Sequence, residues 1–199
     1  MTRPDQARLD AQMDFLAEAD RLKGVVRASR VLRGERFENS AEHSWHVALY
    51  ALTLAEHAPK GCDTGRVIAM LLIHDLVEID AGDAPVFGDH DAAALSAREQ
   101  AAAERLFGLL PADQATRFRA LWDEFEANET VEARFAKSLD RFVPPNLNLA
   151  SGGGSWVDYG VDWDRFETGI GPRIAHGAPG LWDWLAPRAR AFFERMAGR

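Results

Sequence analysis

The chain has 199 residues, a formal net charge of -8 and 47% hydrophobic residues. This length suits one globular domain with a sizeable core. The acidic balance argues against duplex nucleic acid as a partner, and no run of about 18 apolar residues predicts a membrane span. A single cysteine, Cys62, and a polar N-terminal segment favour a reducing cytoplasm as the location.

Helical periodicity dominates the first half of the chain, and no strong strand pattern is present. Three helices are expected there: residues 6–23, about 40–58 and about 64–81. An arginine-rich connection joins the first two. Asn39, with Glu42 three residues on, predicts a capping box at the start of the second helix. Either Asp63 or Thr64 is expected to cap the third.

Four further helices are expected in the second half: residues 90–108, about 111–125, 129–142 and 181–197. Pro144-Pro145 is expected to end the third of these, and residues 151–155 to form a flexible loop. No internal repeat or interdomain linker is apparent. The sequence therefore predicts an all-α fold, a single-domain irregular helical bundle over residues 1–199. Its core is expected at roughly 22–145, with the C-terminal helices packing on it.

The segment 67–79 is apolar on nearly every side of a helix, which is typical of a buried helix. It nevertheless contains His74, Asp75 and Glu78, and burying such groups without partners costs several kcal/mol, on the order of 2–7 for one polar group. A bound metal ion would match them. The alternative is a core histidine bonded to the neighbouring Asp75.

Two other segments carry similar residues. His43 lies in the first turn of the helix that begins near Asn39, and Asp140 lies among apolar residues. The alternatives are a core histidine and a surface carboxylate paired with Lys137 or Arg141. With the adjacent His-Asp pair, they supply two imidazoles and two carboxylates, a set that suits Mn, Fe, Co, Ni or Zn, with Mg possible.

Arginines recur at every third position of residues 27–36. One interpretation is a solvated basic face. The other is a gate that draws phosphate toward the metal, with Arg27 the first candidate and Arg36 the second, since Arg36 leads into the segment of His43.

The order His…His-Asp…Asp resembles the signature of the HD-domain metal-dependent phosphohydrolases, especially the branch of the bacterial and eukaryotic 5′-deoxynucleotidases. The resemblance spans residues 22–140. It is carried by Leu22-Lys23…Arg27, Ser40-Ala-Glu-His-Ser44, Ile73-His-Asp-Leu-Val-Glu78, Gly82-Asp83-Ala-Pro85 and Ser138-Leu-Asp140. The resemblance implies an HD-domain fold, a divalent cation, a small phosphorylated substrate such as a nucleotide, and a homodimer.

The resemblance also implies a role for each matching residue. The residues that match metal ligands are His43, His74, Asp75 and Asp140. Glu78 matches the acid that handles the proton of the attacking water, Asp83 a residue near the sugar or a further metal, and Arg27 an arginine that reaches the phosphate. Ala28 stands where the bacterial enzyme has a tryptophan that excludes a 2′-hydroxyl, so deoxyribose selectivity does not follow.

These features together predict a phosphomonoesterase that acts on nucleoside 5′-monophosphates or similar small phosphates through metal-activated water. A phosphodiesterase or nucleotide triphosphohydrolase of the same superfamily is one alternative. A non-catalytic, metal-stabilised module that senses a nucleotide is another, although a nearby acid such as Glu78 favours catalysis.

Overall fold

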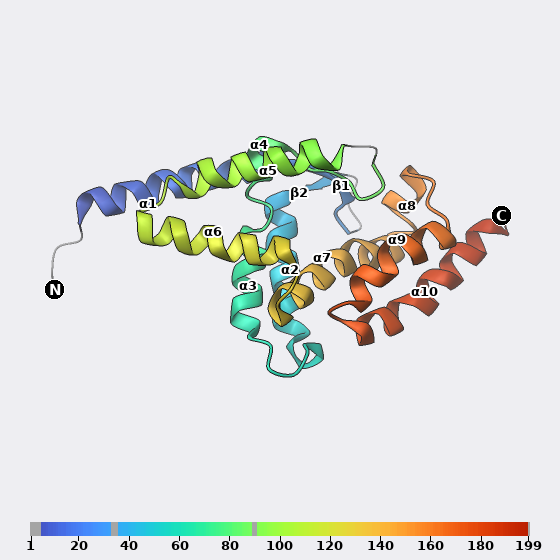
Figure 1. Cartoon of the computed structure of the whole chain (residues 1–199). Helices are drawn as coiled ribbons and strands as arrows, with labels where there is room; N and C mark the ends of the chain where they lie inside the picture. Colours follow the sequence, from blue (N-terminus) through green and yellow to red (C-terminus); the bar gives the residue numbers. More distant parts are fainter. Residues whose placement is uncertain (1–4, 33–35, 89–90, 199) are drawn as a thin grey trace.

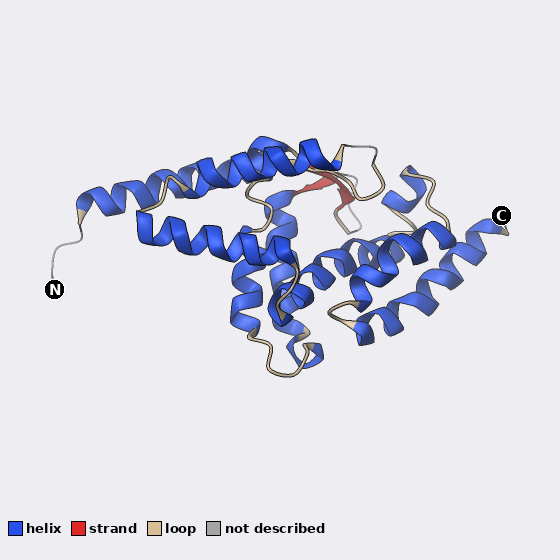
Figure 2. Cartoon of the chain, in the orientation of Figure 1, coloured by secondary structure: helices blue, strands red, loops and turns tan. Residues whose placement is uncertain are grey.

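Helices make up most of the computed structural model, which describes residues 5–32, 36–88 and 91–198 (Figures 1 and 2). This confirms the predicted all-α class. Within these ranges no helix is both long enough and apolar enough to cross a membrane. The longer helices are α1 (Gln6–Ala19), α2 (Ser40–Thr53), α3 (Thr64–Ile73), α5 (Ala92–Phe107), α6 (Ala112–Ala127), α7 (Val131–Ala150), α9 (Trp163–Ala175) and α10 (Pro179–Ala197). The shorter ones are α4 (Glu78–Ala81), α8 (Ser155–Asp158) and the 3-10 turns η1 (Asp20–Gly24) and η2 (Ala55–His57).

A short pair of antiparallel strands, which the sequence did not indicate, lies within the arginine-rich connection. β1 (Val26–Arg30) pairs with β2 (Phe37–Asn39), and Val26 lies opposite Asn39. Extended backbone sends alternate side chains to opposite faces. Glu38 is therefore buried between two residues that remain partly or fully exposed.

Local capping signals set the helix starts as expected. Asn39 accepts a hydrogen bond from the backbone N–H of Glu42, and the Glu42 side chain accepts one from the Asn39 N–H, which completes the predicted capping box. Asp63 caps α3 by accepting from the N–H of Arg66. The first of these caps places His43 in the first turn of α2.

The buried segment 67–79 is not one continuous helix. α3 ends at Ile73, and α4 begins at Glu78. Between them the chain makes tighter turns, in which the N–H of Leu76 bonds to the carbonyl of Ile73 and that of Glu78 to Asp75. This break changes the relative directions of the ionisable side chains that follow the apolar run.

Helix α7 lies at the centre of the molecule and contacts α2, α3, α6, α9 and α10 (Figure 1). The prediction that Pro144-Pro145 ends this helix is wrong, because α7 continues to Ala150. The two prolines cannot donate hydrogen bonds to the carbonyls of Asp140 and Arg141. Packing on several neighbouring helices offsets that loss, and Pro145 itself is buried.

The apolar core has two parts on either side of this arrangement. One joins α2, α3 and α7 to the C-terminal helices α9 and α10, and the other joins α1, α5 and α6 (Figure 1). Helix α9 was not expected from the sequence, where Gly169, Gly171 and Pro172 mask its helical pattern. Gly171 is needed for packing, since a Cβ there would lie 2.8 Å from the ring of Trp182.

Candidate metal centre and cavity

Three buried side chains lie close enough to share one ion. One ligand atom from each of His43, His74 and Asp75 lies within 4.8 Å of the others. His43 comes from the first turn of α2, whereas the other two follow the end of α3. The helix packing of α2 on α3 therefore brings together residues that are 31 and more positions apart in the chain, and the two imidazole ring centroids are 5.7 Å apart.

His74 is oriented by its own helix. Its Nδ1 lies 2.9 Å from the carbonyl oxygen of Leu71, which can only accept, so Nδ1 carries a proton and Nε2 faces the cluster. Nε2 is buried and has no hydrogen-bond partner among the described residues. It lies 3.0 Å from Asp75 Oδ1. Burial lowers the pKa of His74, but Asp75 and Asp140 outweigh burial and raise it to about 9.

Asp140 of α7, the fourth ligand predicted from the sequence, lies beside the two imidazoles. Its Oδ1 lies 2.9 Å from His43 Nε2 and 3.7 Å from His74 Nε2, and the residue is buried rather than on the surface. Burial raises its pKa, but Arg141 and the two imidazoles outweigh this and hold the pKa well below the usual value. Two imidazoles and two carboxylates that lie this close together are the kinds of ligand that a divalent transition metal takes.

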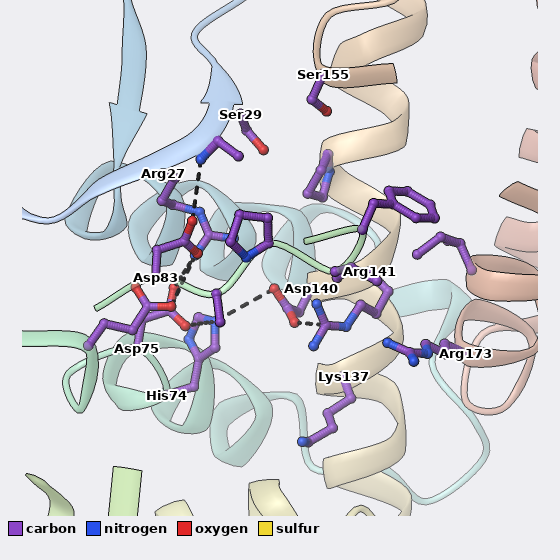
Figure 3. A pocket seen from close by; sticks show the side chains of 18 of the residues that line it. Arg27, Ser29, His74, Asp75, Asp83, Lys137, Asp140, Arg141, Ser155 and Arg173 are labelled. Carbon is purple, nitrogen blue, oxygen red and sulfur yellow. Dashed lines mark hydrogen bonds and ion pairs between the residues drawn. The ribbon is translucent and has the colours of Figure 1, made fainter. Parts of the chain in front are cut away.

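Arg27 of β1 lies beside this cluster, surrounded by carboxylates (Figure 3). It donates a hydrogen bond of 2.9 Å to Asp75. Its nitrogens also lie 3.5 Å from Asp83, 3.6 Å from Glu78 and 3.6 Å from Glu38. Burial lowers the pKa of Arg27, but the negative charges of Asp75, Glu78 and Asp83 outweigh burial and raise it.

Glu38 is a site residue that the sequence analysis missed. It is only 3% exposed, and its Oε1 lies 3.5 Å from His43 Nδ1 but accepts no hydrogen bond from the described residues. The Glu38 carboxylate thus lies beside Nδ1 of the imidazole, whereas Asp140 lies beside Nε2. Recognition of β2 would have found it, because the alternation of a strand sends Glu38 inward between Phe37 and Asn39.

Glu78 and Asp83 face the same region as Arg27. Ser40 donates a hydrogen bond of 2.5 Å to Glu78, and the backbone N–H of Ala28 donates one of 3.3 Å to Asp83. Burial raises the pKa of both carboxyls, that of Glu78 to about 8. Carboxyls with raised pKa values in a cleft are candidates for proton transfer.

A cavity of about 360 Å³ opens onto these groups. The residues that line it include Arg27, His74, Asp75, Glu78, Asp83 and Asp140, together with the aromatic Trp156 and Tyr159. The fold places β1 on one side of this cavity and α7 with α9 on the other (Figure 3). This volume lies within the range of small-molecule sites.

Arg36, the second arginine candidate from the sequence, lies elsewhere. It is exposed and makes ion-paired hydrogen bonds of 2.6 and 2.8 Å to Glu42, and it is not among the described residues that line the cavity. His46 of α2 packs against the rings of Trp45 and Tyr50. Arg173, which no sequence pattern singled out, does line the cavity, because α9 packs on α7.

Comparisons with known proteins agree with this geometry. A model of the HD domain family matches residues 19–182. A solved structure from Magnetospirillum magnetotacticum, described as a predicted metal-dependent phosphohydrolase, is 44% identical with a TM-score of 0.89, and the match covers 95% of this chain and 97% of that one.

Curated relatives are more distant. A 5′-deoxynucleotidase of Bos taurus is 32% identical over 131 residues, which are 65% of this chain and 62% of the relative. Its human counterpart is 28% identical over 130 residues, with the same coverage. The match thus spans less than two thirds of the length of these relatives.

Proposed function

Because the chain belongs to the HD-domain family, we propose that it is a metal-dependent phosphohydrolase. The observation that supports this proposal is that His43, His74 and Asp75 lie close enough to share one ion, with Asp140 beside both imidazoles. His74, Asp75 and Asp140 also line the cavity. The proposed ligands are His43, His74, Asp75 and Asp140. Their nitrogen and oxygen atoms suit Mn, Fe, Co, Ni or Zn, and Mg is possible.

The buried Nε2 of His74 supports a metal at this place. An unpartnered polar atom inside a protein is costly, and a cation among these carboxylates would match it. Such a cation supplies Lewis acidity, which activates water and offsets phosphoryl charge. Because a ligating imidazole must lose its competing proton, metal affinity should fall toward acid pH.

The residues around the proposed ligands have separate roles in the proposed reaction. Glu78 is placed to accept a proton from the water that attacks phosphorus, while the bond from phosphorus to the leaving oxygen breaks. Ser40 holds the Glu78 carboxylate in position. We assign Asp83 to the sugar or leaving oxygen, and Arg27 to the phosphoryl oxygens nearest Asp75. Arg36 has no part here, since it pairs with Glu42.

We infer that the substrate is a nucleoside 5′-monophosphate or a similar small phosphate ester. The names of the curated relatives and the size of the cavity support this class. Ala28 lines the cavity with only a methyl group, so a ribose 2′-hydroxyl meets no bulky ring at that position. A homodimer and a cytoplasmic location stay predictions from the sequence.

The proposal is tested by phosphate release from a panel of phosphomonoesters, diesters and nucleoside triphosphates. The protein is first treated with a chelator and then loaded with Mn, Co, Ni, Zn or Mg. Release from monoesters that depends on metal is expected. Release from diesters alone would favour a phosphodiesterase, and bound metal with no release from any compound would contradict a hydrolase and favour a sensor.

Two variants separate the assigned roles. Glu78→Ala should keep the metal and lose at least about 100-fold in kcat, because general-base catalysis contributes about 10²–10⁴-fold. Asp140→Ala should lose both metal and turnover. Metal content is measured on the purified variants beside their activity. Equal metal loss in the two variants would contradict the role given to Glu78.

A further inference from the structure

The cavity wall opposite Arg27 carries a cluster of positive charge. Lys137 and Arg141 come from α7, and Arg173 comes from α9. All three line the cavity, and Figure 3 shows them on the far side of Asp140 from Arg27 and Asp83. The site is therefore acidic and metal-binding at one end and basic along one wall.

These three cations differ in whether a carboxylate of the protein neutralises their charge. Lys137 pairs with Glu126 at 3.1 Å, and Arg141 lies 3.6 Å from Asp140. For Arg173, no carboxylate partner is present among the described residues. Partial desolvation beside the cavity lowers the pKa of Arg173, although the residue as a whole is exposed, and the nearby charge of Arg141 lowers it further. Two guanidinium groups that repel each other beside a cavity are stabilised when an anion lies between them.

The charge of Arg27, which we assign to the phosphoryl oxygens, offsets only part of the charge of a phosphate. Arg27 already faces four carboxylates within 3.6 Å. A phosphate monoester brings a charge of about -1.5 to -2 at neutral pH. Arg141, by contrast, lies directly behind the proposed ligand Asp140, and Arg173 lies beside Arg141. An anion at the metal centre is thus within the field of these two side chains.

We propose that Arg141 and Arg173 form the clamp that binds a phosphoryl group of the substrate in this cavity. Two planar forks suit the oxygens of a phosphoryl group better than ammonium groups do. The inference rests on the proposed function, because it takes the ligand to be a phosphate ester. The phosphoryl group bound is either the one that is hydrolysed or a second one on the same molecule.

Binding of inorganic phosphate to the metal-loaded protein, measured by calorimetry, tests the clamp without turnover. Arg173→Gln should weaken phosphate binding by about 10- to 100-fold, the loss of a charged hydrogen bond. Arg173→Lys keeps the positive charge but loses the planar guanidinium, so its phosphate affinity should lie between that of the unsubstituted protein and that of Arg173→Gln. Arg190→Gln is the matched control, since Arg190 lies on α10, is 61% exposed and pairs with Glu194 outside the cavity.

Unchanged phosphate affinity in Arg173→Gln would overturn the clamp, and so would an equal loss in Arg190→Gln. Thermal melts verify that the variants fold; Arg173 is exposed, so its replacement should leave the melting temperature unchanged. The phosphate measurement also separates this inference from the proposed function. If phosphate binding depends on Arg173 but the protein has no turnover, the hydrolase proposal fails and the clamp proposal stands. If the protein turns over substrate but phosphate binding does not depend on Arg173, the clamp proposal fails and the hydrolase proposal stands.

Kinetics with two kinds of substrate identify which phosphoryl group is held. A rise in KM for simple monoesters in Arg173→Gln places the clamp on the group that is hydrolysed. A rise confined to substrates with a second phosphoryl group places it on that group. In the second case KM should change more than kcat, because a cation remote from the reacting phosphorus binds the ground state and the transition state alike. In the first case kcat should fall as well, because the cation then faces the charge that develops on the reacting group.

Discussion

Arg27 offers the sharpest test of the electrostatics of the site, through the variant Arg27→Met in chelator-treated protein. The guanidinium side chain is only 11% exposed and faces four carboxylates, the nearest at 2.9 Å. At an effective dielectric constant of about 20, one such pair attracts by about 6 kcal/mol. Desolvation of the ions cancels several kcal/mol of this attraction. Removing one partner of a buried ion pair typically destabilises by about 3–5 kcal/mol, and we expect a loss in this range.

Urea unfolding of the two proteins measures this loss directly, and thermal melts should show a fall of about 6–20 °C for a domain of this size. The control is Arg190→Met, which removes an exposed arginine and should change stability by less than about 1 kcal/mol. Addition of a divalent cation should restore part of the lost stability, since it offsets the same carboxylates. A loss in Arg27→Met no larger than in the control would refute the reasoning, because it would mean that Arg27 does not neutralise these charges.

Two further predictions concern single positions. Burial raises the pKa of the Cys62 thiol to about 11, so its alkylation at pH 8 should be about 100-fold slower than that of free cysteine and should accelerate about tenfold per pH unit up to pH 10. Mass spectrometry of iodoacetamide time courses measures this, and a plateau between pH 8 and 9 would contradict it. Ala28→Trp should lower kcat/KM for ribonucleoside 5′-monophosphates about tenfold more than for the deoxy forms, because an indole would crowd the 2′-hydroxyl. An unchanged ratio in a folded variant would show that Ala28 does not face the sugar.

Signals that act within a few residues were readable from the sequence. The capping box of Asn39 and Glu42 and the cap at Asp63 involve neighbours three residues apart, so no distant contact is needed to form them. The apolar run 67–79 indicated burial in the same way. Because buried ionisable residues need partners, the run also pointed to His74 and Asp75 as part of a site.

Backbone features that depend on packing were not readable in this way. Pro144-Pro145 reads as a helix end, yet α7 continues through the pair because neighbouring helices hold it. The interruption between α3 and α4 likewise lies inside an apolar run that looks uniform. Strands β1 and β2 depend on pairing across a connection whose arginines suggested either a solvated basic face or a gate for phosphate.

By itself, the sequence determined that the protein is helical, where most helices begin, and which four side chains are the best candidates for a metal, because these depend on local caps, apolar spacing and the chemistry of a few residues. Only the tertiary structure decided that Glu38 lies behind His43, that Arg27 is held among carboxylates, and that Arg173 stands beside Arg141. These are contacts between segments far apart in the chain. Strand alternation could have indicated that Glu38 points inward, but only the packing of these segments determines which side chains meet.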